Sequence, residues 1–190
     1  METTPRSYRL VMPDSWFRIP LEDERKRQAA ARDLTSRVFR GIGDAPGLQA
    51  RLLNMLNDQA SAARAVGGLE LYVSMLEAAG FPLSASLVVS LLPGPPAEID
   101  GAEAARSLCT LLGSEGKRVR TGTVAGQPAV QTRHRSGQGN VAPTATQDVY
   151  VLVPGGKGWL LMSFSTPVVE LVSQMEELFD AITGTLSWCD

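Results

Sequence analysis

The stretch RVRTGTVAGQPAVQTRHR, which spans residues 118–135, decides the fold because two alternating segments flank a tight turn. On both sides of Ala125-Gly126 the side chains alternate with a period of two, which is typical of β-strands. The short connection predicts a two-residue hairpin. In such a hairpin Arg118 lies directly opposite Arg133, so the register of two antiparallel strands follows from the sequence alone.

The segments around this hairpin predict more strands and a few helices. Alternation favours further strands, and apolar residues at helical spacing favour helices, one of them at the C-terminal end. We expect extended segments at residues 8–12, 16–19, 69–75, 83–91, 118–124, 129–135, 145–153 and 159–165, connections at residues 79–82 and 136–143, and helices at residues 22–66 (a helical hairpin), 98–112 and 168–186. This order predicts an α+β fold in which helices flank an antiparallel β-sheet.

The length and composition fit one compact domain over residues 1–190, with the 22–66 helical hairpin as an insertion. Of its residues 44% are apolar and 20% are charged, and the net charge is −2. We find no transmembrane stretch and no signal sequence, and therefore expect a cytoplasmic protein that does not bind membranes. The excess of arginine over lysine and the many alanines suggest a GC-rich genome.

The residues available for catalysis are few. His134 is the one histidine, and it shares a strand face with Val130 and Thr132, so we expect a partly buried, hydrogen-bonded side chain and not a catalytic base. The two cysteines, Cys109 and Cys189, leave a redox role open, but together with one histidine they do not suffice for a metal site. We therefore predict a protein that is not an enzyme and holds no metal or cofactor.

Four arginines form the most informative polar feature. In the predicted register Arg118, Arg120, Arg133 and Arg135 project from one side of the sheet. Like charges repel across a ladder, so such a group needs nearby acids, solvent or an anionic partner. A solvated outer face is one interpretation, and a docking surface for an acidic protein segment or a phosphate group is the other. The negative net charge argues against nucleic acid as the partner.

Aromatic residues offer an alternative site. Trp16, Tyr72, Tyr150 and Trp159 would line a pocket between the sheet and the helices if the protein bound a small ligand or acted as an enzyme. Aromatic residues also pack in cores, which is the other interpretation of the same four.

Several short motifs resemble those of a known superfamily. The early turn Pro13-Asp14-Ser15-Trp16, the hairpin segment Gly126-Gln127-Pro128-Ala129, the strands at 149–153 and 159–164 and the helix at 168–186 are similar to the Mog1/PsbP-like superfamily with its LpqN-type bacterial members. The absence of a signal sequence and of a lipidation cysteine near the start departs from the LpqN type.

The resemblance implies an α/β sandwich that serves mainly to bind other proteins and shares no catalytic constellation. Our leading hypothesis is accordingly a non-enzymatic accessory or scaffold module that binds another protein with an acidic surface through the arginines or the 136–143 loop. A narrower version is an accessory or immunity-like factor in a bacterial specialised secretion locus. Homo-oligomerisation, including packing of the helical hairpin between copies, stays open.

Overall fold

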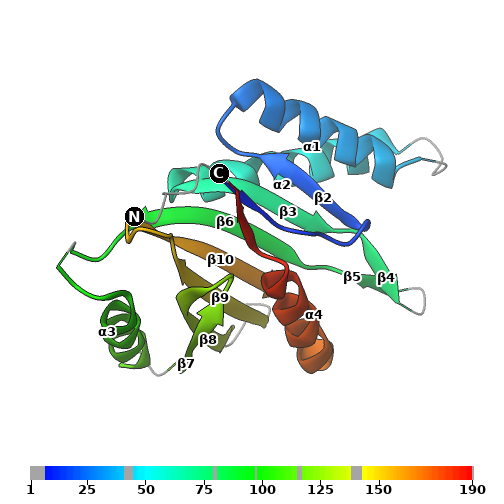
Figure 1. The fold of residues 1–190 in the computed structure, drawn as a ribbon. Coiled ribbons are helices and arrows are strands. Elements are labelled where there is room, and N and C mark those ends of the chain that lie inside the picture. The colour runs from blue at the N-terminus through cyan, green and yellow to red at the C-terminus, as the bar shows by residue number, and fades with distance from the viewer. Residues whose placement is uncertain are drawn as a thin grey trace.

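The computed structural model describes residues 7–40, 45–78, 81–96, 98–114, 117–137 and 143–189. Its centre is a seven-stranded sheet in the order β2-β3-β6-β10-β9-β8-β7, with antiparallel neighbours throughout (Figure 1). The strands are β2 Trp16–Pro20, β3 Gly68–Ser74, β6 Ser86–Pro93, β7 Arg118–Val124, β8 Gln127–Ser136, β9 Thr144–Leu152 and β10 Gly158–Thr166. Two small sheets pair β1 Ser7–Arg9 with β11 Ser187–Cys189 and β4 Leu76–Ala78 with β5 Phe81–Leu83.

Helices cover both faces of the large sheet. They are α1 Glu24–Val38, α2 Pro46–Ala65, α3 Gly101–Gly113 and α4 Val172–Gly184. On one face α1 and α2 pack against β2 and β3, and α3 packs against β7 and β8 at the other end. On the opposite face α4 packs against β9 and β10. None of the helices in the described ranges is long and apolar enough to cross a membrane.

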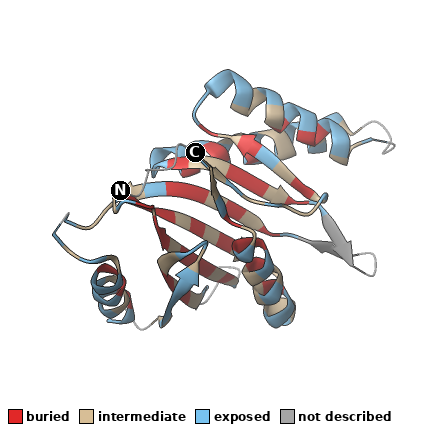
Figure 2. Cartoon of the chain, in the orientation of Figure 1, coloured by how far each residue is buried: buried red, intermediate tan, exposed pale blue. Residues whose placement is uncertain are grey.

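Alternation along the strands divides the core between the two faces (Figure 2). The α4 face includes Phe164, whose ring stacks on that of Phe179 with centroids 4.7 Å apart. The opposite face holds Leu71 under the helical hairpin and Val130 under α3. Each of these side chains is at most 2% exposed, so both faces of the sheet are needed to complete the core.

The expected fold class and central hairpin are confirmed. Ala125 and Gly126 adopt the positive φ values of 50° and 75° that a two-residue hairpin turn favours. Arg118 pairs with Arg133 and Arg120 with Gln131, as the turn predicted. The helical hairpin is present as α1 and α2, and part of its connection, residues 41–44, lies outside the described residues.

The ends of the chain differ from the expectation. The predicted helix at 168–186 is divided into a 3₁₀ turn, Val169–Leu171, and α4, and the residues after it form β11. The first extended segment is shorter than predicted and pairs with β11, not with its sequence neighbour β2. A strand whose partner lies at the far end of the chain carries no local signal, and three residues are too few to show alternation.

Two boundaries in the middle of the chain also differ. Of the connection predicted at 79–82, Phe81 and Pro82 belong to the strand β5, and residues 79–80 lie outside the described residues. The third helix begins at Gly101 and not at Glu98, because the carboxylate of Asp100 accepts a hydrogen bond from the backbone N–H of Ala102 and caps the helix there.

Candidate functional site

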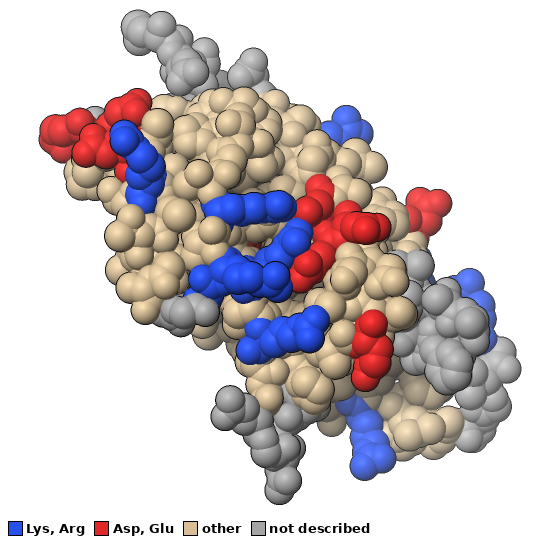
Figure 3. Space-filling model, turned by 90° about the horizontal axis from the view of Figure 1, so that it is seen from below, with Lys and Arg blue, Asp and Glu red and all other residues tan. Residues whose placement is uncertain are grey.

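The four arginines of the central hairpin lie on the face that carries α4. We call Arg118, Arg120, Arg133 and Arg135 the arginine patch. Figure 3 shows basic and acidic side chains side by side on the surface of the molecule. The acids nearest to the patch come from α4, whose Glu176 and Asp180 are four residues apart and so lie on one side of the helix.

Asp180 is the centre of a hydrogen-bond network that joins α4 to the sheet. Its carboxylate accepts hydrogen bonds from Arg133 at 2.7 Å, Gln131 at 2.8 Å, Gln147 at 2.9 Å and Arg120 at 3.2 Å. These donors come from three neighbouring strands, β7, β8 and β9. The network therefore fixes the position of α4 over this end of the sheet.

The electrostatics of the network depend on this set of donors. Burial alone raises the pKa of Asp180, but hydrogen bonds from Gln131, Arg133 and Gln147 and the charge of Arg133 outweigh burial, so the pKa is lowered. Asp180 is therefore a charged acceptor at neutral pH.

Arg133 is the most engaged member of the arginine patch. Its guanidinium donates to Glu176 at 2.9 Å, to Asp180 at 2.7 Å and to the amide oxygen of Gln147 at 2.8 Å. The Gln147 side chain is 1% exposed, and it donates to Asp180 while it accepts from Arg133. For Arg133 and Arg120, nearby acids are thus the condition that allows like charges to share this face, because Glu176 and Asp180 of α4 pair with them.

Arg118 and Arg135 behave differently. Both are exposed, and neither has an acidic partner within the described part of the chain. A hollow of about 290 Å³ next to them is lined by Arg118, Arg133, His134, Arg135 and Glu176. Within the patch, Arg120 and Arg133 thus pair with the carboxylates of α4, and Arg118 and Arg135 remain available to an external anion.

His134 is half-buried, as expected, but its Nδ1 is buried without a hydrogen-bond partner in the described residues. Within the described residues, Nδ1 therefore does not make the hydrogen bond that was expected for His134. Cys109 and Cys189 are both half-buried free thiols, on α3 and β11 respectively. Among the described residues no group of three His, Cys, Asp or Glu side chains could hold a metal ion.

The aromatic residues proposed as a pocket do not come together. Trp16 and Tyr72 belong to the core on the α4 face, whereas Trp159 and Tyr150 pack on the α3 face. Trp16, Tyr72 and Trp159 are each 7% exposed, and Tyr150 is half-buried. This set is therefore core packing on two faces of one sheet, because the four residues lie on four different strands, two directed to each face.

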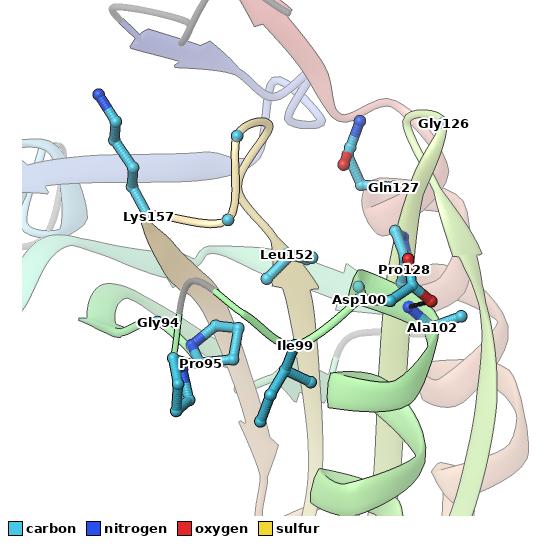
Figure 4. A pocket seen from close by; sticks show the side chains of 14 residues that line it. Gly94, Pro95, Ile99, Asp100, Ala102, Gly126, Gln127, Pro128, Leu152 and Lys157 are labelled. Carbon is cyan, nitrogen blue, oxygen red and sulfur yellow. Dashed lines mark hydrogen bonds between the residues drawn. The ribbon is translucent and has the colours of Figure 1, made fainter.

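A larger pocket lies instead at one end of the sheet (Figure 4). It has a volume of about 840 Å³ and lies between the loop after β6, the β7–β8 turn and the β9–β10 turn. Ile99, Pro128 and Leu152 contribute apolar walls, and Lys157 extends from its rim. A Cβ atom at Gly94 would lie 2.4 Å from the carbonyl oxygen of Gly156, so only glycine allows these loops to meet.

A second polar cluster, which was not predicted from the sequence, anchors the N-terminal strand. The hydroxyls of Tyr8 and Tyr72 each donate to Oε2 of Glu70 at 2.8 Å, and Arg18 pairs with the other carboxylate oxygen. Burial, followed by the charge of Glu70, raises the pKa of both tyrosines well above its usual value of 10. Glu70 and Tyr72 alternate on one strand, which is a visible signal, but nothing in the sequence indicated that Tyr8 would join them.

Comparisons with known proteins bear on the fold. No family model matches the chain, and no curated protein matches it by sequence. Among solved structures it is similar to LpqN, described as involved in cell envelope biogenesis of Mycobacterium tuberculosis, with 14% identity, a TM-score of 0.53, and coverage of 100% of this chain and 91% of that chain. PsbP (CyanoP) from Synechocystis matches with 11% identity, a TM-score of 0.45, and coverage of 99% and 91%. The chain resembles the Mog1/PsbP-like superfamily in its fold.

Proposed function

We propose that the chain is a non-enzymatic interaction module that binds an acidic segment of a partner protein at the arginine patch. The observation that supports this most directly is the pair Arg118 and Arg135, two exposed guanidiniums without an acidic partner among the described residues. They flank Arg133, which the acids of α4 hold in place. Guanidinium groups suit this role because their planar donors match a carboxylate in a bidentate arrangement.

The local charges support an anionic partner. Glu176 pairs with Arg133, and Asp180 pairs with both Arg133 and Arg120, so neither carboxylate forms an ion pair with Arg118 or Arg135 in the described part of the chain. The network holds Arg133, which lies between them, in one position before binding, so that this part of the patch loses little entropy on association. Nucleic acid is the weaker choice of partner, because the chain has a net charge of −2.

The narrower proposal is an accessory or immunity-like factor in a bacterial specialised secretion locus. The support for it is the fold, which the chain shares with LpqN, a protein described as involved in cell envelope biogenesis. Deletion of the gene in its native host would then reduce export of the substrates of that locus, and unchanged export would contradict this version.

Affinity capture from an extract of the native host tests the main proposal. We would compare the wild type with the double variant Arg118→Glu/Arg135→Glu, which reverses two charges without touching the Asp180 network. The matched control, Arg32→Glu/Arg51→Glu, reverses two exposed arginines on α1 and α2. Equal thermal stability of the three proteins is checked first.

We expect the wild type and the control to retain the same partner and the patch variant to lose it. Capture that the patch variant retains at full strength would refute the arginine patch as the binding surface. Loss of capture by the control as well would show a general charge effect and not a specific site.

The alternative function, binding of a small ligand, now rests on the pocket of about 840 Å³ and not on the aromatic residues. A ligand present at 100 times its dissociation constant would stabilise the protein by about 2.7 kcal/mol. A thermal-shift screen over metabolites detects this, and Leu152→Trp, which fills the pocket wall, should abolish any such shift.

A further inference from the structure

The two edges of the large sheet are protected differently. At one edge β2 is short, ends in Pro20 and packs against α1, features that discourage a further strand. At the other edge β7 contains no proline, pairs with β8 in an unbroken register and is exposed along most of its length. In the part of the chain that the structure describes, β7 is the last strand on this side.

The backbone of β7 has hydrogen-bonding groups to offer. Residues that flank a two-residue hairpin turn form a hydrogen-bonded pair, and bonded and non-bonded pairs then alternate along the ladder. Starting from the pair Val124 and Gln127, this alternation directs the N–H and C=O groups of Val119, Thr121 and Thr123 away from β8, toward the open edge. These three residues could pair with a further strand without any change in the sheet.

The side chains of β7 that lie on the α4 face are charged at one end and absent at the other. Arg118 and Arg120 lie opposite Arg133 and Gln131, and Gly122 follows two residues later on the same face. A Cβ atom at Gly122 would have no heavy atom within 4 Å. A strand added to this edge would therefore meet the guanidinium of Arg118, then that of Arg120, which is exposed but also donates to Asp180, and then open space.

The open space belongs to a hollow of about 430 Å³ between the hairpin and the end of α4. Ala129 and Val149, which are 3% and 2% exposed, contribute apolar surface. Thr183, on α4, also lines it and is 6% exposed, and its buried Oγ1 has no hydrogen-bond partner among the described residues.

The geometry points to β-strand addition: an extended acidic segment of the partner protein pairs with β7 as an eighth strand. This inference rests on the proposed function and specifies the form of the partner. In the antiparallel direction that the rest of the sheet uses, two acidic side chains at alternate positions lie over Arg120 and Arg118. The side chain two positions before the first acid enters the hollow beside Gly122.

A synthetic peptide tests the arrangement directly. The peptide Ser-Thr-Val-Thr-Glu-Thr-Glu-Thr-Ser, labelled with fluorescein, places valine and both glutamates on one face of a strand. Its control, Ser-Thr-Val-Thr-Thr-Glu-Glu-Thr-Ser, has the same composition and charge but sends one glutamate to the other face. Fluorescence polarisation with the full chain should show binding of the first peptide that is at least about tenfold tighter than binding of the control.

Two variants at one position separate the backbone from the side chain. Thr121→Pro removes an N–H that faces the open edge and should weaken peptide binding by about tenfold or more, whereas Thr121→Val keeps that N–H and should bind normally. If the proline variant does not fold, the wild type is tested with a peptide whose amide opposite Thr121 is N-methylated, with the same expected loss.

Equal affinity for the two peptides, or full binding to a folded Thr121→Pro protein, would overturn strand addition. A concentration-dependent dimer in light scattering that Thr121→Pro abolishes would likewise overturn it, because the edge would then bind a second copy of the chain. If the native partner is lost on Arg118→Glu/Arg135→Glu but retained by Thr121→Pro, strand addition fails and the proposed function stands. If neither variant affects capture, both fail.

Discussion

Replacing Gln147 with leucine tests whether the polar network attaches α4 to the sheet. The side chain is 1% exposed and has a hydrogen bond to each of two charged groups, Arg133 at 2.8 Å and Asp180 at 2.9 Å. Leucine has a similar size, so the change removes both hydrogen bonds without a large cavity. The guanidinium of Arg133 and the carboxylate of Asp180 each lose one hydrogen-bond partner on the side that Gln147 had shielded from water.

The magnitude follows from these contacts. A hydrogen bond to a charged group contributes about 1.5–3 kcal/mol. Water can compensate in part, because the side chain of Asp180 is 41% exposed and that of Arg133 is 23% exposed. We therefore expect Gln147→Leu to lower the free energy of unfolding by about 2–3 kcal/mol, below the full value of two such bonds because water compensates in part.

Urea unfolding at neutral pH is the measurement, with the m-value as a check that both proteins unfold in one comparable transition. The control Gln174→Leu makes the same chemical change at an exposed position of α4 and should change stability by less than about 0.5 kcal/mol. A loss below about 0.5 kcal/mol for Gln147→Leu would refute the reasoning, since the network would then contribute no more than a surface contact.

Three further predictions concern other parts of the structure. Because the pKa of Asp180 is lowered in the folded protein, the carboxylate contributes its full stabilisation above the usual pKa of 3.8 and loses it as the pH falls through the lowered pKa. In acid unfolding experiments, the stability of Asp180→Asn should therefore not show this decrease. The raised pKa of Tyr8 and Tyr72 keeps both phenols neutral above pH 10 in the folded protein, whereas the same phenols ionise in the unfolded chain, so the free energy of unfolding should fall as the pH rises beyond about 10. In a stability measurement over that range, the free energy of unfolding of Tyr8→Phe/Tyr72→Phe should fall by less than that of the wild type. Gly94→Ala should destabilise the protein by about 1–3 kcal/mol in thermal unfolding, because the new Cβ would lie 2.4 Å from a backbone oxygen, whereas Gly47→Ala on α2, with no atom within 4 Å, should be neutral or slightly stabilising.

Local patterns were sufficient for much of the fold. The hairpin turn at Ala125-Gly126 and the alternation on both sides of it predicted the pairing of Arg118 with Arg133. These features depend on residues a few positions apart, which physically contact one another in a helix or hairpin. They could not predict that Ser7–Arg9 pairs with Ser187–Cys189, because that contact joins the two ends of the chain.

The candidate site shows where such local reasoning ends. A period of two determined that Arg118, Arg120, Arg133 and Arg135 share one face of the sheet. Alternation cannot determine what covers that face, because the answer depends on where a helix some forty residues later in the chain comes to pack. Only the tertiary structure placed Glu176 and Asp180 of that helix on Arg133, and so decided which arginines remain available to a partner.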